Sequence, residues 1–210
     1  MNAQRHVVPH AGTVTVKDRN RLNGHRSLTV WFTGLPASGK STIAHALEEK
    51  LYDRGIRTYV LDGDNVRRGL NSDLGFSRED RQENIRRISE ISWLLMDAGV
   101  VVLCAFISPF EEDRRCVRER LGGDRYLEVY VRCSLETCES RDPKDQYKKA
   151  RAGLIKNYTG VSTPYEEPRN PDLTIDTEEV SVHGAVSSLL SVMSERHFLR
   201  LENESDRPLE

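Results

Sequence analysis

Two hydrophobic patterns alternate along the chain. Short, continuous apolar runs are typical of strands, and apolar residues spaced three or four apart are typical of helices. The runs predict strands at residues 28–33, 58–61, 100–107, 126–131 and 173–175. The spaced pattern predicts helices at residues 41–54, 79–98 and 182–193.

Helices that separate strands imply right-handed crossover connections, and therefore strands that run parallel. We expect a three-layer α/β domain, with a central, mostly parallel five-stranded sheet and helices on both faces. Ligands of such sheets bind at the carboxyl ends of the strands. Functional residues are therefore expected in the segments that follow the strands.

The chain has 210 residues, enough for one domain, which we place at residues 28–200. Residues 1–27 show no sustained hydrophobic period and are expected to form an N-terminal arm that lies on the domain. Residues 201–210 form an acidic tail that we expect to be frayed.

The net charge of −2 disfavours a general nucleic-acid-binding protein. The longest apolar run, residues 100–107, is much shorter than the roughly 20 residues that cross a bilayer, which disfavours a membrane partner. The first ten residues are polar and lack the apolar centre of a signal peptide. The sequence therefore predicts a cytoplasmic protein.

The four cysteines are Cys104, Cys116, Cys133 and Cys138, and no two of them have the C-x-x-C spacing of a zinc motif. We expect free thiols in a reducing cytosol, with Cys104 and Cys133 packed as small apolar residues in strand-like segments. A regulatory disulfide is the alternative.

The segment after the first strand matches the phosphate-binding motif G-x-x-x-x-G-K-[ST] at every fixed position. Its glycines let backbone N–H groups approach phosphates, its lysine adds a charge near the β- and γ-phosphates, and its serine is a hard ligand for Mg²⁺. This motif predicts the P-loop NTPase fold. We expect the triphosphate at Gly34, Leu35, Pro36, Ala37, Ser38, Gly39, Lys40, Ser41 and Thr42.

Two carboxylates and an arginine, Asp62, Asp64 and Arg67, follow the second predicted strand. A carboxylate at this place can hold a Mg²⁺-bound water or accept the proton of an attacking hydroxyl. The alternative is that Asp62 and Asp64 form a turn and cap the next helix. The sequence has no Asn-Lys-x-Asp motif for guanine, which disfavours a GTPase.

Several blocks together resemble the adenylyl-sulfate kinase (APS kinase) family of P-loop kinases, over about residues 23–177. The most specific are Asp-Gly-Asp-Asn at residues 62–65 and Arg-x-x-Asn-Ile-Arg-Arg at residues 81–87. Further matching blocks are residues 23–25, 30–41, 69–71, 73–77, 106–109, 141–144, 147–153, 158–160, 164–166 and 170–173.

The resemblance implies transfer of the ATP γ-phosphoryl group to the 3′-hydroxyl of adenosine 5′-phosphosulfate, which yields 3′-phosphoadenosine 5′-phosphosulfate and ADP for sulfate assimilation. It implies that Mg²⁺ accompanies ATP, with Ser41 and Asp64 as ligands. The catalytic residues that it implies are Lys40, Asp62, Asp64 and Ser108. Which aspartate acts as the base is open. Direct in-line transfer is favoured over a phosphoserine intermediate at Ser108.

For the acceptor, the resemblance places the adenine between Phe76 and Tyr158, where most relatives carry Phe instead of Tyr158. It places the phosphosulfate on Arg67 and Arg81, with Asn84 assisting, because guanidinium groups make paired bonds to oxyanions. The other acceptor-binding residues that it implies are Ile107, Ser108 and Lys148.

Residues 142–160 are rich in lysine and contain glycine, which favours a mobile lid that closes over ATP and excludes water. An exposed basic helix is the alternative. This region departs from the family, because Asp145 and Gln146 stand where relatives usually show Gly-Leu, and Ser162 where they often carry Asp.

Two other functions stay open at this point: a related P-loop kinase with a different small-molecule acceptor, and a catalytically silent nucleotide-binding regulator. Retention of Lys40, Ser41, Asp62 and Asp64 speaks against the second. The resemblance leaves two partners open, a second copy in a homodimer and an ATP sulfurylase in functional coupling.

Overall fold

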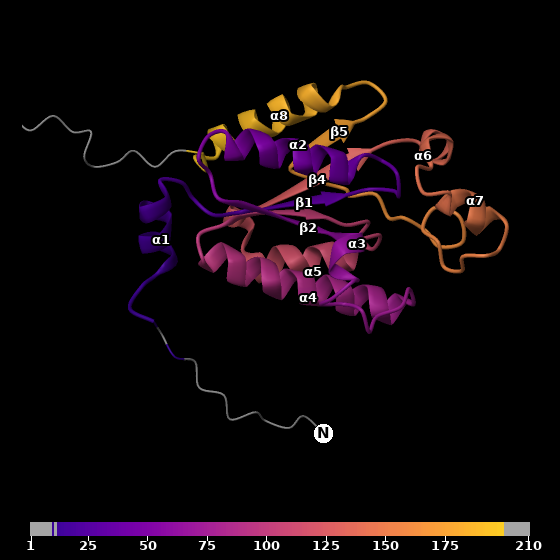
Figure 1. Ribbon diagram of the computed structural model, residues 1–210, viewed down its shortest axis with the longest axis horizontal. Coiled ribbons are helices and arrows are strands. Elements are labelled where there is room, and N and C mark those ends of the chain that lie inside the picture. Colours follow the sequence, from indigo (N-terminus) through magenta and orange to yellow (C-terminus); the bar gives the residue numbers. More distant parts are fainter. Residues whose placement is uncertain (1–9, 11, 200–210) are drawn as a thin grey trace, which may run out of the picture.

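The computed structural model describes residue 10 and residues 12–199. One sheet of five parallel strands has the order β2-β3-β1-β4-β5 (Figure 1). The strands are β1 Thr29–Thr33, β2 Thr58–Asp62, β3 Val101–Ala105, β4 Tyr126–Arg132 and β5 Leu173–Asp176. The expected three-layer α/β fold is confirmed, and every strand pair in the described residues is parallel.

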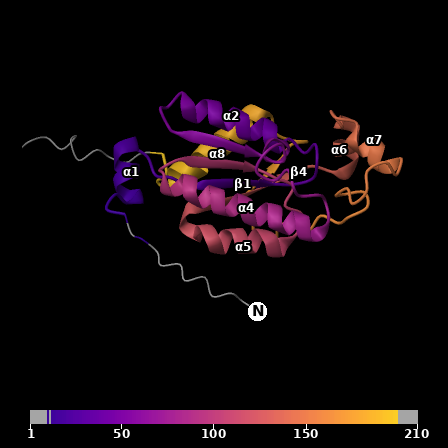
Figure 2. The ribbon, with the colours of Figure 1, turned by 60° about the horizontal axis from the view of Figure 1, so that its bottom comes forward.

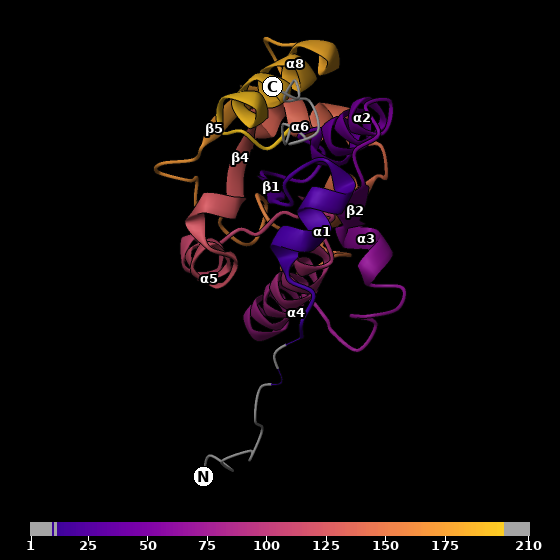
Figure 3. The same cartoon turned by 90° about the vertical axis from the view of Figure 1, so that its left-hand side faces the viewer.

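Two pairs of helices cover the sheet. On one face lie α2 (Lys40–Tyr52) and α8 (Val182–Glu195), and on the other lie α4 (Arg78–Asp97) and α5 (Glu111–Leu121) (Figures 1 and 3). The shorter helices are α1 Val16–Asn23, α3 Gly63–Val66, α6 Leu135–Arg141 and α7 Gln146–Arg151. The last two lie together at the end of the molecule opposite α1 (Figure 2).

The central strand β1 is buried on both faces, which explains its continuous apolar sequence. Val30 and Phe32 belong to the hydrophobic cluster under α2 and α8. Trp31, between them, belongs to the cluster under α4 and α5. Two cores therefore fix β1 from opposite sides, and the phosphate-binding segment that follows β1 starts from a rigid base.

The predicted boundaries of the strands and long helices agree with the structure to within a few residues, with one correction. The predicted strand 100–107 ends at Ala105. Phe106 N–H still donates to the Phe32 carbonyl, but Ser108 has a φ of 38°, in the left-handed region, and turns the chain away from the sheet. The apolar run extends past the strand because residues 106–109 remain largely enclosed.

Among the described residues, five α-helices lie outside the three predicted ones, namely α1, α3, α5, α6 and α7, and α7 falls in the segment where a basic helix was the alternative to a lid. In α5 the buried face includes the charged residues Asp113 and Arg114 beside Val117 and Leu121, so the apolar spacing is interrupted. In α1 no residue is buried, and a capping box between Thr15 and Asp18 starts the helix. Ser134 caps α6 through its side chain, and α5 carries the ion pair between Arg115 and Glu119. Interactions of this kind do not appear in a hydrophobic pattern.

The arm reaches the rest of the protein through polar contacts. Arg19 of α1 pairs with Asp97 at 2.9 Å, and Asn23 donates to the Gly99 carbonyl at 2.9 Å. The acidic tail, residues 201–210, lies outside the described residues. Within the described part of the chain, no helix combines the length and apolar character needed to span a membrane.

The first glycine after β1 allows a close approach to β4. Gly34 has a φ of 151°, and a Cβ placed there would lie 2.4 Å from the Val131 carbonyl oxygen. We predict that Gly34→Ala lowers the free energy of unfolding by about 2 kcal/mol, because both the backbone angle and the contact must change. Thermal and urea unfolding measure the loss.

Gly69→Ala is the matched control, because a Cβ at Gly69 meets no atom within 4 Å and its φ is ordinary. Its effect should stay within about 0.5 kcal/mol. Equal stability of the two variants would contradict this account of the β1–β4 contact.

Candidate active site

A cavity of about 570 Å³ lies at the carboxyl ends of the strands. Its wall is built from four segments, namely the phosphate-binding loop after β1, the segment after β2, the start of α4 with the loop before it, and the segment after β3. The lid, residues 142–160, forms a further part of the wall. The segments that the sequence singled out are thus brought together at one edge of the sheet.

The phosphate-binding loop has the geometry of an anion site. Gly39, with a φ of 103°, leads directly into α2, so the helix N-terminus faces the cavity. The Lys40 ammonium is buried and donates to the Gly34 carbonyl at 2.9 Å, the Leu35 carbonyl at 2.5 Å and the Ser38 hydroxyl at 3.3 Å. The loop therefore folds around its own lysine.

Burial lowers the pKa of Lys40 to about 8, because the ammonium loses most of its hydration. Among the described residues no carboxylate is hydrogen-bonded to the ammonium; its partners are carbonyl and hydroxyl oxygens. A phosphate group in the loop would supply the missing negative charge.

The two aspartates after β2 have different partners. Asp62 caps α3 by accepting from Asp64 N–H at 3.0 Å, which agrees with the alternative interpretation for this residue. Its other carboxylate oxygen accepts from the Ser41 hydroxyl at 2.5 Å. The Asp64 carboxylate pairs with Lys144 of the lid. Asp62 therefore links the phosphate loop to β2, whereas Asp64 links α3 to the lid.

The Phe76 ring lies close to two arginines. The guanidinium carbons of Arg67 and Arg81 are 4.4 Å and 5.6 Å from the ring centroid. Arg67 donates to the Leu74 and Gly75 carbonyls, at 3.1 Å and 3.0 Å. Arg67, Phe76 and Arg81 line the cavity, whereas Leu74 and Gly75 do not.

Arg81 donates to the Phe76 carbonyl at 3.2 Å and to the Asn157 carbonyl of the lid at 2.6 Å. Burial lowers the pKa of both Arg67 and Arg81, and the nearby charge of Arg67 lowers that of Arg81 further. Two like charges beside one cavity, hydrogen-bonded to carbonyl oxygens, favour an anionic ligand.

The other expected acceptor residues take three positions. Asn84 is buried, lines the cavity and accepts from the Asn71 amide at 2.9 Å. Tyr158 lines the cavity but is only 9% exposed, because its ring packs edge-on against Tyr147. Lys148 is exposed and lies outside the wall of the cavity, to which Lys144 and Lys156 contribute instead.

The departures from the family pattern contact one another in the lid. The Tyr158 hydroxyl donates to Gln146 Oε1 at 3.3 Å, and the Tyr158 N–H donates to the Ser162 hydroxyl at 2.9 Å. The Tyr147 hydroxyl in turn donates to the Pro36 carbonyl of the phosphate loop at 3.0 Å. The polar group of Gln146 thus has a specific partner, the hydroxyl that distinguishes Tyr158 from Phe.

Ile107 and Ser108 line the cavity at the end of β3. The Ser108 hydroxyl, however, faces β1: it accepts from the Trp31 indole at 3.1 Å and donates to the Thr33 hydroxyl at 2.8 Å. Ser108 is 2% exposed. Its side chain is therefore engaged in the sheet, and its backbone forms part of the wall.

A second cavity, of about 320 Å³, adjoins the phosphate loop and was not predicted from the sequence. It lies between the loop, α2 and the segment from Thr177 to Val182. Arg141 donates to the Thr177 hydroxyl and carbonyl, each at 2.9 Å, and Thr177 donates to the Ser38 carbonyl at 3.0 Å. Its walls come from segments about 140 residues apart, so no local motif reveals it.

All four cysteines are free, as expected. Burial raises the pKa of Cys104 and Cys138 to about 12, so both thiols are protonated near neutral pH. Cys116 is exposed on α5.

Comparison with known proteins adds an independent finding. Residues 26–176 match the family model of adenylylsulphate kinase. A probable adenylyl-sulfate kinase of Halalkalibacterium halodurans is 57% identical over 190 residues, which cover 90% of this chain and 94% of that protein. An adenylyl-sulfate kinase of Geotalea uraniireducens is 55% identical over 190 residues, which cover 90% of this chain and 91% of that protein.

Among solved structures, the Mycobacterium tuberculosis APS kinase in complex with AMPPNP and APS superposes with a TM-score of 0.78. The two sequences are 46% identical, and the match covers 81% of this chain and 99% of that chain.

The lowered pKa of Lys40 predicts that the protein takes up a proton when ATP binds. Because its pKa in the free protein is about 8, nucleotide phosphates should restore the ammonium by raising this pKa, so ATP binding at pH 8.5 should take up a proton. The uptake should be roughly 0.7 proton, and ATP affinity should fall as the pH rises above 8. Calorimetry in two buffers of different ionisation enthalpy measures it.

Lys40→Met is the control, because it removes the titrating group and keeps an apolar stem of similar length. The variant should show no uptake linked to this group. Equal proton uptake by the variant and the unaltered protein would contradict the assignment.

Proposed function

Since the chain belongs to the adenylylsulphate kinase family, we propose that it transfers the γ-phosphoryl group of ATP to the 3′-hydroxyl of adenylyl sulfate. The products are 3′-phosphoadenylyl sulfate and ADP. One observation carries the proposal: a single cavity joins the phosphate loop to an aromatic ring with two arginines beside it, and Asp62 and Asp64 are among its lining residues. ATP fits the chemistry of one part, and an anionic purine nucleotide fits the other.

The phosphate loop holds and neutralises the ATP phosphates. In the proposal, Lys40 leaves its carbonyl partners and contacts the β- and γ-phosphates, while the loop N–H groups and the N-terminus of α2 contact the others. The second cavity, between the loop and Thr177, suits the nucleoside of ATP because it adjoins the loop and is largely apolar in lining.

Ser41 and Asp62 would provide hard oxygen atoms for Mg²⁺, and their contact of 2.5 Å supports a shared position beside the phosphate loop. In the described residues no group of three or more His, Cys, Asp or Glu side chains could hold a metal alone, so ATP oxygens and water would complete the ligands. We keep Asp64 as a further ligand through rotation away from Lys144. Bound Mg²⁺ would neutralise charge that develops on the transferred phosphoryl group.

The acceptor lies in the other part of the cavity. Its adenine stacks on Phe76, which is 55% exposed, while the largely buried Tyr158 bounds the same space. Arg67 and Arg81 exchange their carbonyl partners for the phosphosulfate, and Asn84 adds an amide. Asp62 or Asp64 accepts the proton of the 3′-hydroxyl as the hydroxyl attacks.

The proposal uses direct transfer between the two nucleotides. A phosphoserine intermediate would require the Ser108 hydroxyl to leave two hydrogen bonds in the sheet and turn to the cavity. Ser108 contributes through its backbone. Lys144 and Lys156 take the cationic role in the lid, and Lys148 acts only if lid closure moves it inward.

The proposal includes a reducing, cytoplasmic location, which the four free cysteines support. We also propose a homodimer. Functional coupling to an ATP sulfurylase is proposed because an enzyme that adenylylates sulfate must supply the acceptor. Sedimentation tests the first, and a coupled assay with added sulfurylase tests the second.

Release of ADP tests the function. ATP with adenylyl sulfate should give sustained ADP release, and ³¹P NMR should show a phosphate ester at the 3′ position. Activity with adenosine or gluconate but none with adenylyl sulfate would establish a kinase with another acceptor. Tight nucleotide binding without turnover on any of them would indicate a regulator.

Substitution of Arg81 tests binding of the acceptor separately from binding of ATP. We predict that Arg81→Ala raises the KM for adenylyl sulfate about tenfold or more and leaves the KM for ATP within about twofold, because a charged hydrogen bond to the acceptor is lost. Initial rates with each substrate varied in turn measure both constants.

Arg86→Ala is the matched control on the same helix, because the guanidinium of Arg86 is exposed and, among the described residues, its hydrogen-bond partner is the Glu83 carboxylate. It should leave both constants unchanged. A change confined to the KM for ATP in Arg81→Ala would show that the arginine pair does not bind the acceptor.

A further inference from the structure

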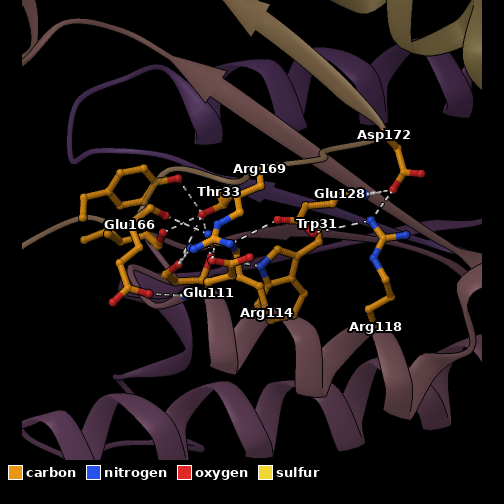
Figure 4. A network of polar contacts seen from close by, with 12 residues as sticks. Trp31, Thr33, Glu111, Arg114, Arg118, Glu128, Glu166, Arg169 and Asp172 are labelled. Atoms are coloured by element: carbon orange, nitrogen blue, oxygen red, sulfur yellow. Dashed lines mark hydrogen bonds and ion pairs between the residues drawn. The ribbon is translucent and has the colours of Figure 1, made fainter.

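A buried arginine lies behind the wall of the cavity, at Arg114 on α5. Its side chain is 1% exposed, and all three donor groups of the guanidinium have partners (Figure 4). Nε donates to Glu128 at 3.0 Å, one terminal nitrogen donates to the Ser108 carbonyl at 2.7 Å, and the other donates to the Glu166 carbonyl at 2.7 Å. A buried charge with this complete a set of partners fixes the groups that it contacts.

The Ser108 carbonyl belongs to a residue that needs support. Ser108 has a φ of 38°, an angle that side chains other than glycine rarely adopt. Arg114 holds this residue from one side through its carbonyl, and β1 holds it from the other through its hydroxyl. The turn therefore persists because two independent contacts determine it.

The contacts on β1 form one ordered chain. The Trp31 indole donates to the Ser108 hydroxyl, which donates to the Thr33 hydroxyl, and Thr33 donates to the Ile107 carbonyl at 2.8 Å. The Tyr165 hydroxyl lies 3.0 Å from the same Thr33 oxygen. Ile107 and Ser108 are thus fixed on the side away from the cavity that they line.

Arg114 also joins this turn to the segment that follows the lid. Its contact with the Glu166 carbonyl is next to a backbone bond from Glu166 N–H to the Pro109 carbonyl, at 2.8 Å. The Glu166 carboxylate accepts from Glu111 N–H at the start of α5, at 2.7 Å. The Arg114 guanidinium therefore connects the turn at Ser108 with the segment at Glu166, and both segments border this side of the site.

We propose that Arg114 is a positioning residue for phosphoryl transfer: through the Ser108 carbonyl it sets the Ile107–Ser108 backbone against which the acceptor nucleotide lies. This inference rests on the proposed function in taking that part of the cavity as the acceptor side. Arg114 contacts no substrate itself, because its side chain is enclosed between α5, β4 and the turn.

The test compares two arginines of one buried network. Arg114→Met removes the donors to Ser108 and Glu166. Arg118→Met, one helical turn further along α5, removes ion pairs with Glu128 and Asp172 but no contact with Ser108 (Figure 4). Arg114→Lys keeps the positive charge but has one donor nitrogen in place of the three nitrogens of the guanidinium. For each variant we would measure kcat, the KM for adenylyl sulfate, the KM for ATP and the melting temperature.

Arg114→Met should raise the KM for adenylyl sulfate about tenfold relative to any change in the KM for ATP, and Arg114→Lys should restore part of this difference. Arg118→Met should lower the melting temperature, and it should leave the ratio of the KM for adenylyl sulfate to the KM for ATP unchanged. The proposal is overturned if Arg114→Met changes both constants equally, or if Arg118→Met gives the same separation. If Arg114→Met does not fold, Arg114→Lys decides, and wild-type constants in that variant overturn the proposal.

A second readout does not depend on the acceptor. The indole N–H resonance of Trp31 in a ¹H–¹⁵N spectrum reports its bond to the Ser108 hydroxyl. Arg114 substitution should shift this resonance and speed its hydrogen exchange, whereas Arg118→Met should leave it in place. An unchanged resonance in Arg114→Met overturns the positioning role, whereas failure of the unaltered protein to phosphorylate adenylyl sulfate defeats only the proposed function.

Discussion

The parallel pairing of β1 with β3 and β4 is the constraint on which the whole site depends. Because the strands share a direction, the segments after β1, β2 and β3 emerge at one edge of the sheet. The burial of β1 on both faces by two hydrophobic clusters gives that edge a fixed position. The phosphate loop, the aspartates and the Ser108 turn are neighbours for this reason, although up to about 70 residues separate them in the chain.

The charges at this edge show what the site is built to receive. Lys40, Arg67 and Arg81 donate to backbone carbonyls or hydroxyls, and burial lowers the pKa of each. Within the part of the chain that the structure describes, each cation therefore has hydrogen bonds but no opposing charge in direct contact. Two polyanionic nucleotides would supply that charge, and binding both would bring their phosphates and hydroxyl together. Binding would exchange these hydrogen bonds to carbonyl and hydroxyl oxygens for contacts with phosphate and sulfate groups.

The sequence predicted the features that are encoded locally. The order of strands and helices followed from apolar spacing, and Lys40 and Ser41 followed from a motif whose spacing requires a helix N-terminus. The buried arginine on α5 could not be predicted, since an arginine among charged neighbours usually lies on the surface. The cavity at Thr177 and the hydrogen bond between Tyr158 and Gln146 also depend on tertiary packing. The resemblance to a family supplied the acceptor residues that no local rule identifies.

A crystal structure with adenylyl sulfate and a non-hydrolysable ATP analogue would show whether both nucleotides bind in this cavity. We expect the triphosphate on the phosphate loop, the adenine on Phe76, and the guanidinium groups of Arg67 and Arg81 on the phosphosulfate. The arginines would then have left the carbonyls of Gly75 and Asn157. An acceptor bound elsewhere, with both arginines still on those carbonyls, would contradict the account.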